Sequence, residues 1–154
     1  MIFSEFNNRW HRRLVLRTEL ITAFSNMRTL LDTAGIDIEM ICGWRGEKDQ
    51  AEAVANGNSR ATFGNSAHNY GAAFDLVPVV NNQPVWEPAE DVWEKIGMAG
   101  EKYGLTWGYD WDGDTVVNDK DPTPGSTFND RPHFEIKNWR EKNFELFHTE
   151  PPIG

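Results

Sequence analysis

The chain has 154 residues, a formal net charge of -9 at pH 7 and one cysteine, Cys42. A chain of this length can build one hydrophobic core, and we predict a single domain over residues 1–154 with its functional core at about 36–137. The acidic charge excludes a nucleic-acid partner, because an acidic protein gains nothing from the release of phosphate counterions. The lone cysteine excludes an internal disulfide.

The sequence shows no targeting or membrane segment. Residues 1–20 contain several charged side chains and lack the apolar stretch of a secretory signal. No apolar run in the chain approaches the length of a membrane span. We therefore expect synthesis in a cytoplasm and no membrane partner. Nothing in the sequence demands an interface between copies, so we also expect a monomer.

The first half of the chain is predicted to form a helix, a strand and a second helix. Apolar residues at helical spacing predict a helix over 10–34, which ends before Gly35. Apolar and acidic residues then alternate over 36–42, a pattern typical of a half-buried strand. In this strand we expect Cys42 to be a small core residue. Residues 47–55 predict a short helix.

The second half is predicted to complete a sheet. Residues 72–80 form an apolar strand, and Pro88 suits the first position of a helix that runs to about 103. The remaining predicted elements are strands at 105–109 and 131–136 and a terminal helix at 138–147. The fold class is therefore α+β, with a small, mainly antiparallel sheet packed with helices.

Two segments carry the candidate metal ligands. Residues 66–75 read SAHNYGAAFD, and residues 130–135 read DRPHFE. Two imidazoles and one carboxylate, from His68, Asp75 and His133, suit zinc, and three protein ligands leave a fourth position open, as in a catalytic site. We therefore predict one zinc ion held by these three residues.

Two further carboxylates lie in the second segment. Asp130 is the candidate general base, because a carboxylate beside a metal-activated water can take up its proton at neutral pH. The alternative is that Asp130 caps the turn before Pro132. Glu135 would accept a hydrogen bond from a ligating imidazole, or it is an exposed strand residue.

These motifs, in this order, resemble the zinc D-Ala-D-Ala carboxypeptidase and L-alanyl-D-glutamate endopeptidase superfamily, which cuts the stem peptides of peptidoglycan. Residues 43–50 (GWRGEKDQ), 55–59 (ANGNS) and 105–111 (LTWGYDW) resemble the endopeptidase branch, several members of which are phage endolysins. Many relatives have glutamate where this chain has Asp130. The shorter side chain implies that the backbone brings the carboxylate closer to the metal.

The resemblance implies a zinc-dependent endopeptidase that cleaves the L-alanyl-D-glutamate bond of a stem peptide. Arg45 would then bind a substrate carboxylate or stabilise the developing oxyanion; the alternative is a surface salt bridge. Gln50 and Ser66 would bind the substrate backbone, or they cap local structure. Of the tryptophans, only Trp107 and Trp111 are considered for substrate contact.

The resemblance also implies a place of action. A phage endolysin without a signal peptide is made in the host cytoplasm and acts in the periplasm or cell wall once the membrane is permeabilised. Two rival functions remain: a D-Ala-D-Ala carboxypeptidase of the same fold, and a non-catalytic, zinc-stabilised wall-binding or phage structural domain. The presence of Asp130 favours an enzyme, because a binding domain has no need of a general base.

The segment 110–129 suggests a second cation. Carboxylates at alternate positions are typical of the first half of a calcium loop. The pattern is imperfect, because Thr115 stands where such a loop has glycine, and the alternative is a solvated acidic loop. The predicted calcium ligands are Asp110, Asp112, Asp114, Asn118 and Asp121.

Overall fold

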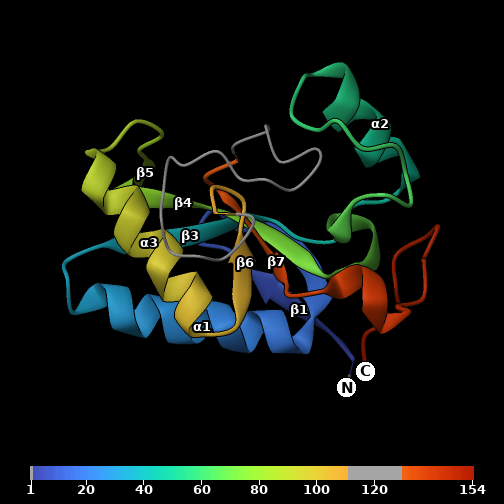
Figure 1. Cartoon of the computed structure of the whole chain (residues 1–154), viewed down its shortest axis with the longest axis horizontal. Coiled ribbons are helices and arrows are strands. Elements are labelled where there is room, and N and C mark those ends of the chain that lie inside the picture. Colours follow the sequence, from blue (N-terminus) through green and yellow to red (C-terminus); the bar gives the residue numbers. More distant parts are fainter. Residues whose placement is uncertain (1, 111–129) are drawn as a thin grey trace.

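A computed structural model describes residues 2–110 and 130–154 of the chain (Figure 1). Within these ranges the helices and strands follow one another as β1 (Phe3–Asn7), β2 (Arg13–Arg17), α1 (Thr18–Asp32), β3 (Asp37–Cys42), α2 (Glu47–Ala55), the 3-10 helix η1 (Ala67–Tyr70), β4 (Ala73–Val80), β5 (Gln83–Pro84), α3 (Glu90–Lys102), β6 (Leu105–Trp107), β7 (His133–Ile136) and the 3-10 helix η2 (Trp139–Lys142).

The larger sheet has the strand order β3-β4-β7-β6, with β5 paired to β4, and all of its pairs are antiparallel. Strands β1 and β2 form a separate antiparallel hairpin. The predicted α+β class, with a mainly antiparallel sheet, is therefore confirmed. Six predicted elements also have counterparts close to their expected positions: α2, β3, β4, α3, β6 and β7.

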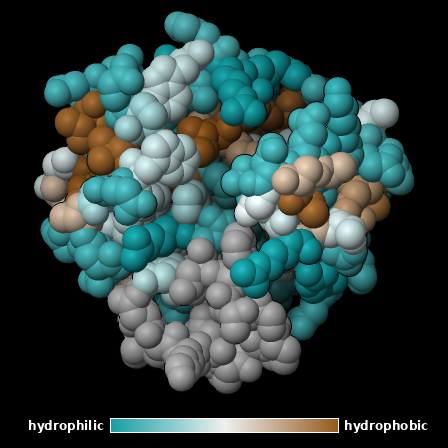
Figure 2. Space-filling model, turned by 90° about the horizontal axis from the view of Figure 1, so that it is seen from above, coloured by the Kyte–Doolittle hydropathy of each residue, from teal (hydrophilic) through white to brown (hydrophobic). Residues whose placement is uncertain are grey.

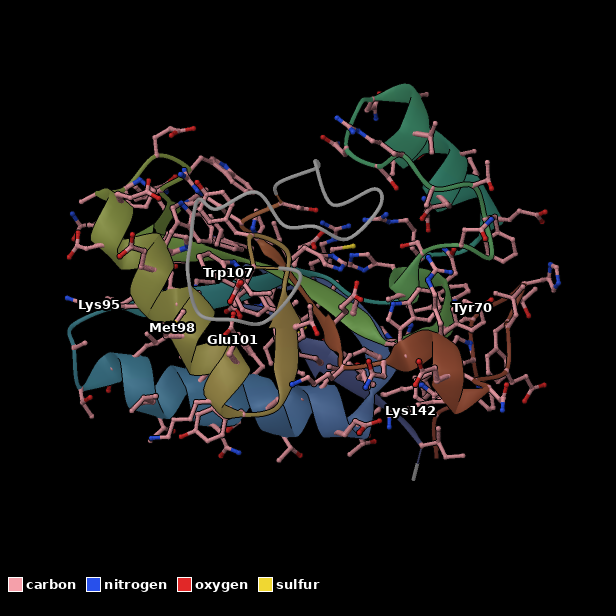
Figure 3. The ribbon with its side chains drawn as sticks, in the orientation of Figure 1. Tyr70, Lys95, Met98, Glu101, Trp107 and Lys142 are labelled. Carbon is pink, nitrogen blue, oxygen red and sulfur yellow. The ribbon has the colours of Figure 1, made fainter. Side chains whose placement is uncertain are left out.

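Helices α1 and α3 pack against each other and against the sheet, whereas α2 lies on the other side of it (Figure 1). Glycines let α3 approach the sheet closely. A Cβ on Gly97 would overlap the ring of Trp107, and one on Gly100 would overlap the ring of Phe134. Figure 3 shows Trp107 beside α3, in the layer between this helix and the sheet. These close contacts anchor β6 and β7, which flank the candidate site.

Two sequence predictions are wrong at the ends of the chain. Residues 13–17 form strand β2 and not the beginning of a helix, because α1 begins only at Thr18. Three successive residues, Leu14, Val15 and Leu16, are buried here, and a short apolar run does not distinguish strand from helix. The terminal helix predicted at 138–147 is limited to the single 3-10 turn η2.

None of the helices in the two described ranges has both the length and the apolar character needed to cross a membrane.

Candidate metal centre

The sheet register aligns three candidate side chains in one row. Asp75 of β4 lies opposite His133 of β7. On its other side, Asp75 lies opposite Cys42 of β3, after an irregularity between Met40 and Cys42. Directly opposite residues in antiparallel strands share a face of the sheet. The row Cys42, Asp75 and His133 therefore crosses three adjacent strands on the same face.

The turn before β4 brings His68 to this row. Ser66 caps η1: its hydroxyl accepts a hydrogen bond from the His68 backbone N–H, and Asn69 completes a reciprocal capping box. Gly71 ends η1 with a φ of 65°, in the left-handed region that favours glycine. This tight turn directs the chain into β4 and leaves the His68 side chain buried beside Asp75.

Three ligand atoms from these residues form a compact triangle. His68 Nε2 lies 3.2 Å from Asp75 Oδ1, His133 Nδ1 lies 3.2 Å from His68 Nε2, and His133 Nδ1 lies 3.3 Å from Asp75 Oδ1. The structure thus brings together the three residues that the sequence predicts as ligands, with one nitrogen or oxygen of each directed at a common point.

The other ring nitrogen of each histidine has a partner of its own. His68 Nδ1 lies 2.9 Å from the carbonyl oxygen of Gly43, and His133 Nε2 lies 2.7 Å from Glu135 Oε1. An N–H at these two positions donates to the oxygens, which leaves the lone pairs of the facing nitrogens directed into the triangle. Such outer hydrogen bonds are the usual means of fixing the tautomer and orientation of a metal-binding imidazole.

The electrostatics of the cluster favour a charged carboxylate. Burial raises the pKa of Asp75, but the charges and hydrogen bonds of His68 and His133 outweigh it, so that the pKa lies well below its usual value. Burial likewise opposes charge on His68, yet the negative charge of Asp75 raises its pKa to about 9 in the metal-free protein. For His133, burial is outweighed by hydrogen bonds to Asp75 and Glu135, and its pKa is raised well above the usual value.

Asp130 lies at the edge of the same cluster. Its carboxylate forms a group with Asp75 and His133 in which the ligand atoms all lie within 4.8 Å of one another. The backbone holds it there: the Asp130 N–H donates to the Gly108 carbonyl at 2.7 Å, and the His133 N–H donates to the Asp130 carbonyl at 3.1 Å. Burial, and then the charge of Asp75, raise the pKa of Asp130. A carboxylate with a raised pKa next to a metal site is a suitable proton acceptor.

Arg45 follows β3 and extends to the same centre. Its side chain is only 11% exposed, and one guanidinium nitrogen lies 3.7 Å from Asp75 Oδ2. A second nitrogen donates to Gln50 Oε1 at 3.1 Å. The predicted alternative, a surface salt bridge, does not describe this position. Arg45 presents a largely buried cation at the side of the candidate metal site.

Gln50 and Ser66, the other two predicted substrate-binding residues, are engaged within the chain. The Gln50 side chain is buried and donates to the Ser59 hydroxyl at 2.9 Å and to the Ala61 carbonyl at 2.6 Å. Together with its bond from Arg45, these contacts support the alternative that the sequence left open: Gln50 and Ser66 organise local structure.

Sequence reasoning missed Asn69. This residue is fully buried; its amide donates to the Arg45 carbonyl at 3.0 Å and to Gln50 Oε1 at 3.2 Å, and its oxygen accepts from the Gly64 and Ser66 backbones. Asn69 therefore joins the loop that carries Arg45 to the turn that carries His68. The available signal was the spacing of Ser66 and Asn69, which is that of a capping box.

The expectation that Cys42 is a core residue is wrong. Its side chain is partly exposed, and its sulfur lies 3.6 Å from a guanidinium nitrogen of Arg45 and 3.9 Å from His68 Nδ1. Burial tends to raise the pKa of this thiol, but the charge of His68 and its hydrogen bond lower it overall. Cys42 therefore lies at the side of the centre, in the same row as Asp75.

Trp107 is also not available for substrate contact, because it is completely buried and its indole N–H donates to the Arg131 carbonyl. Trp111 lies outside the described residues, as do four predicted calcium ligands: Asp112, Asp114, Asn118 and Asp121. Of the predicted calcium set, the structure describes only Asp110, which is buried. The calcium site stays a prediction.

Comparison with known proteins identifies the fold. Residues 59–119, which include His68 and Asp75, match a peptidase family described as D-alanyl-D-alanine carboxypeptidase. The Serratia marcescens L-Ala D-Glu endopeptidase ChiX superimposes with a TM-score of 0.59 at 22% identity, over 82% of this chain and 84% of that chain.

Two further solved structures are similar. A variant of the vancomycin-resistance D,D-pentapeptidase VanY in complex with Zn(II) gives a TM-score of 0.56 at 14% identity, over 86% of this chain and 78% of that chain. The LD-carboxypeptidase LdcB gives 0.57 at 21% identity, over 79% and 59%. These likenesses establish a common fold. Together with the family match over residues 59–119, they agree with the resemblance drawn from the sequence motifs.

Proposed function

We propose that this protein, a relative of the zinc D-Ala-D-Ala carboxypeptidases and L-alanyl-D-glutamate endopeptidases, is a zinc metallopeptidase that hydrolyses peptidoglycan stem peptides. The family match and the common fold support this class of enzyme. The finer proposal is cleavage of the L-alanyl-D-glutamate bond, in the service of phage-induced host lysis. One observation carries the proposal: the triangle formed by His68 Nε2, Asp75 Oδ1 and His133 Nδ1.

The triangle has the dimensions of a zinc site. Ligands at about 2.0–2.1 Å from a tetrahedral ion lie about 3.3–3.4 Å from one another, and the observed separations are 3.2, 3.2 and 3.3 Å. Without a cation, two imidazole nitrogens that both direct lone pairs at a carboxylate oxygen would repel it and each other. The donor set fits zinc, which we propose is held by His68, Asp75 and His133 with one position left open.

The chain's own residues supply the rest of the chemistry. Zinc bound at this site would polarise the scissile carbonyl and activate a water molecule. Asp130 accepts the proton of the attacking water and returns it to the leaving amine, which its position beside Asp75 and His133 allows. Glu135 keeps His133 in the orientation that directs Nδ1 inward. Arg45 provides a positive charge for a substrate carboxylate or for the developing oxyanion.

The choice of bond rests on the substrate's charge. D-glutamate brings a carboxylate next to its amide, and Arg45 is a cation next to the proposed metal site. The motif around Arg45 resembles the endopeptidase branch, and one solved structure with the same fold is named as an L-Ala D-Glu endopeptidase. In this proposal L-alanine stays on the glycan side, and a new amino group appears on D-glutamate.

Mass spectrometry of purified muropeptides after digestion with the zinc-loaded protein tests the proposal. Stem peptides that begin with D-glutamate are the expected product. Free D-alanine from pentapeptide stems would instead select the carboxypeptidase alternative. An unchanged digest, from protein that binds one zinc per chain, would select the non-catalytic alternative.

The proposed endolysin role makes a separate prediction about access. The protein would be made in the host cytoplasm and reach the periplasm or wall only after the membrane is permeabilised. Expression alone should then leave cells intact, whereas expression followed by a membrane-permeabilising agent should lyse them. Lysis of permeabilised cells should disappear in the Asp130→Asn variant, which distinguishes wall cleavage from toxicity of the protein itself.

A further inference from the structure

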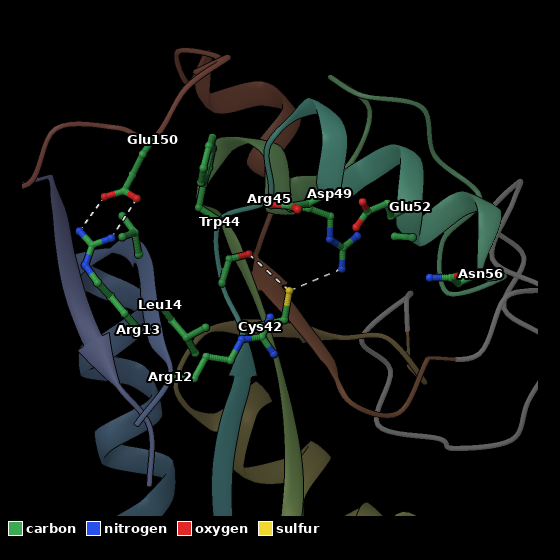
Figure 4. A pocket seen from close by; sticks show the side chains of 13 residues that line it. Arg12, Arg13, Leu14, Cys42, Trp44, Arg45, Asp49, Glu52, Asn56 and Glu150 are labelled. Carbon is green, nitrogen blue, oxygen red and sulfur yellow. Dashed lines mark hydrogen bonds and ion pairs between the residues drawn. The ribbon is translucent and has the colours of Figure 1, made fainter. Parts of the chain in front are cut away.

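A pocket of about 390 Å³ lies next to the metal centre, between the start of β2, the end of β3 and helix α2. Figure 4 shows Arg12 and Arg13 on one side of it, Asp49 and Glu52 on the opposite side, and Cys42 between them. This volume is within the range of about 300–1,000 Å³ that is usual for small-ligand sites. Among the coloured residues on the face seen in Figure 2, hydrophilic ones predominate, with hydrophobic patches between them.

The pocket adjoins the proposed zinc ligands through two of its lining residues. The carbonyl oxygen of Gly43, in the pocket wall, accepts the hydrogen bond from His68 Nδ1. Arg45, also in the wall, lies 3.7 Å from Asp75 Oδ2. A peptide held at the metal centre can therefore continue past Arg45 into the pocket.

One wall of the pocket carries an available positive charge. Arg13 is engaged by Glu150 at 2.6 and 2.9 Å and by Glu5 at 2.8 Å. Arg12 is exposed. Its backbone N–H donates to the Asn8 side chain, but within the described part of the chain the Arg12 guanidinium forms no hydrogen bond or ion pair. The Arg12 guanidinium is thus free to bind an anion, whereas the charge of Arg13 is already compensated.

The opposite wall carries available negative charge. Asp49 and Glu52 are exposed residues of α2 that line the pocket, and their spacing of three places them on one face of the helix. Neither carboxylate forms an ion pair with another described residue. The pocket is therefore bipolar, with the Arg12 guanidinium on one side and the carboxylates of Asp49 and Glu52 on the other. Arg45, the remaining cation of the wall, lies beside Asp75 of the metal centre.

We infer that this pocket binds the third residue of the stem peptide, and that it selects a side chain that ends in both an ammonium and a carboxylate. The inference rests on the proposed function, because D-glutamate at the metal centre places the next residue within reach of the pocket. A diamino diacid such as meso-diaminopimelate presents its ammonium to Asp49 and Glu52 and its carboxylate to Arg12. Lysine at the same position leaves Arg12 unused.

The test compares two synthetic peptides, L-Ala-γ-D-Glu-meso-diaminopimelate and L-Ala-γ-D-Glu-L-Lys, as substrates of the zinc-loaded protein. The wild type should hydrolyse the first with a kcat/KM about tenfold higher, the effect of one charge-assisted hydrogen bond. In Arg12→Gln this ratio should fall to about one. The matched control Lys48→Gln, which removes one positive charge from an exposed residue of α2 that does not line the pocket, should keep the wild-type ratio.

The ammonium side is tested by the double variant Asp49→Asn/Glu52→Gln, which should lower kcat/KM for both peptides, since both carry an ammonium. Equal hydrolysis of the two peptides by the wild type, or an unchanged ratio in Arg12→Gln, would overturn the inference while leaving the endopeptidase intact. Failure of the proposed function looks different, because neither peptide would then be cleaved at the alanyl-glutamate bond.

Discussion

Replacement of Glu135 should weaken zinc binding without touching a zinc ligand. Glu135 Oε1 lies 2.7 Å from His133 Nε2, and the carboxylate is only 16% exposed. Glu135 lies between Ala73 of β4 and Thr106 of β6, so its backbone is fixed on both sides. Substitution therefore removes an acceptor that orients the imidazole and makes its inward nitrogen more basic, while the sheet stays in place.

The expected loss of zinc affinity follows from the hydrogen bond between Glu135 and His133. Loss of an outer-shell carboxylate costs about 10- to 100-fold in metal affinity, and each factor of ten corresponds to about 1.4 kcal/mol. Glu135→Gln keeps one oxygen acceptor and should lose about tenfold. Glu135→Ala, with no acceptor, should lose about a hundredfold, or about 2.7 kcal/mol.

Two measurements check these values. Competition with a chromophoric chelator gives the zinc dissociation constant of each variant. At a fixed zinc concentration well above that constant, the alanine variant should also lose about 2.7 kcal/mol of zinc-derived stability. For a domain of this size that loss lowers the melting temperature by about 5–11 °C. The difference should vanish when both proteins are stripped of zinc.

A matched control comes from η2, where the exposed Glu141 makes no contact with the metal centre. Glu141→Ala should keep the wild-type zinc affinity. The reasoning fails if Glu135→Ala binds zinc within twofold of the wild type, or if its melting temperature falls by the same amount with and without zinc. The second outcome would mean that Glu135 supports the sheet and not the orientation of His133.

Three further predictions concern the same centre. Asp130→Asn should retain zinc yet lose about a hundredfold or more in the rate of stem-peptide hydrolysis; loss of zinc as well would make Asp130 a ligand. Gly108→Ala should reduce both zinc affinity and rate, because the added methyl would overlap the Asp130 carbonyl and come within 3.0 Å of His133 Cβ; wild-type values would show that this turn yields without cost. In the apoprotein, the raised pKa of His68, about 9, gives a stability contribution that is fully present below about pH 6.5. This contribution is lost as the pH rises to about 9, so urea unfolding in chelator should show falling stability over that window, and a flat profile would refute the assignment.

The metal ligands could be predicted from the sequence because their chemistry is local and specific. An imidazole seven residues before a carboxylate, and a second imidazole with a carboxylate on either side, leave few other uses for His68, Asp75 and His133. The α+β class was also predictable, since periodicity identifies single elements. The structure adds the register that pairs Asp75 with His133, which depends on contacts between segments far apart in the chain.

The sequence predictions that were wrong have a common physical cause. Strand β2 pairs with the neighbouring β1 and buries Leu14 to Leu16, but a short apolar run in the sequence does not show whether it forms a strand or a helix. Gln50 and Asn69 are polar residues that are buried because each finds several partners, whereas a sequence shows only their polarity. The position of Cys42 follows from an irregularity after Met40, which an alternating pattern does not predict.

The cluster that we propose holds zinc is costly to the fold without it. Asp75 is a largely buried carboxylate between two buried imidazoles, and such charges destabilise a protein unless each is paired. In the apoprotein, protonated histidines can compensate Asp75, but only at the expense of two further buried charges. One zinc ion replaces both protons and needs neutral imidazoles, whose outer nitrogens already donate to Gly43 and Glu135. The same hydrogen bonds that orient the ligands therefore make the folded state selective for the metal-bound form, so that zinc binding and stability should rise and fall together.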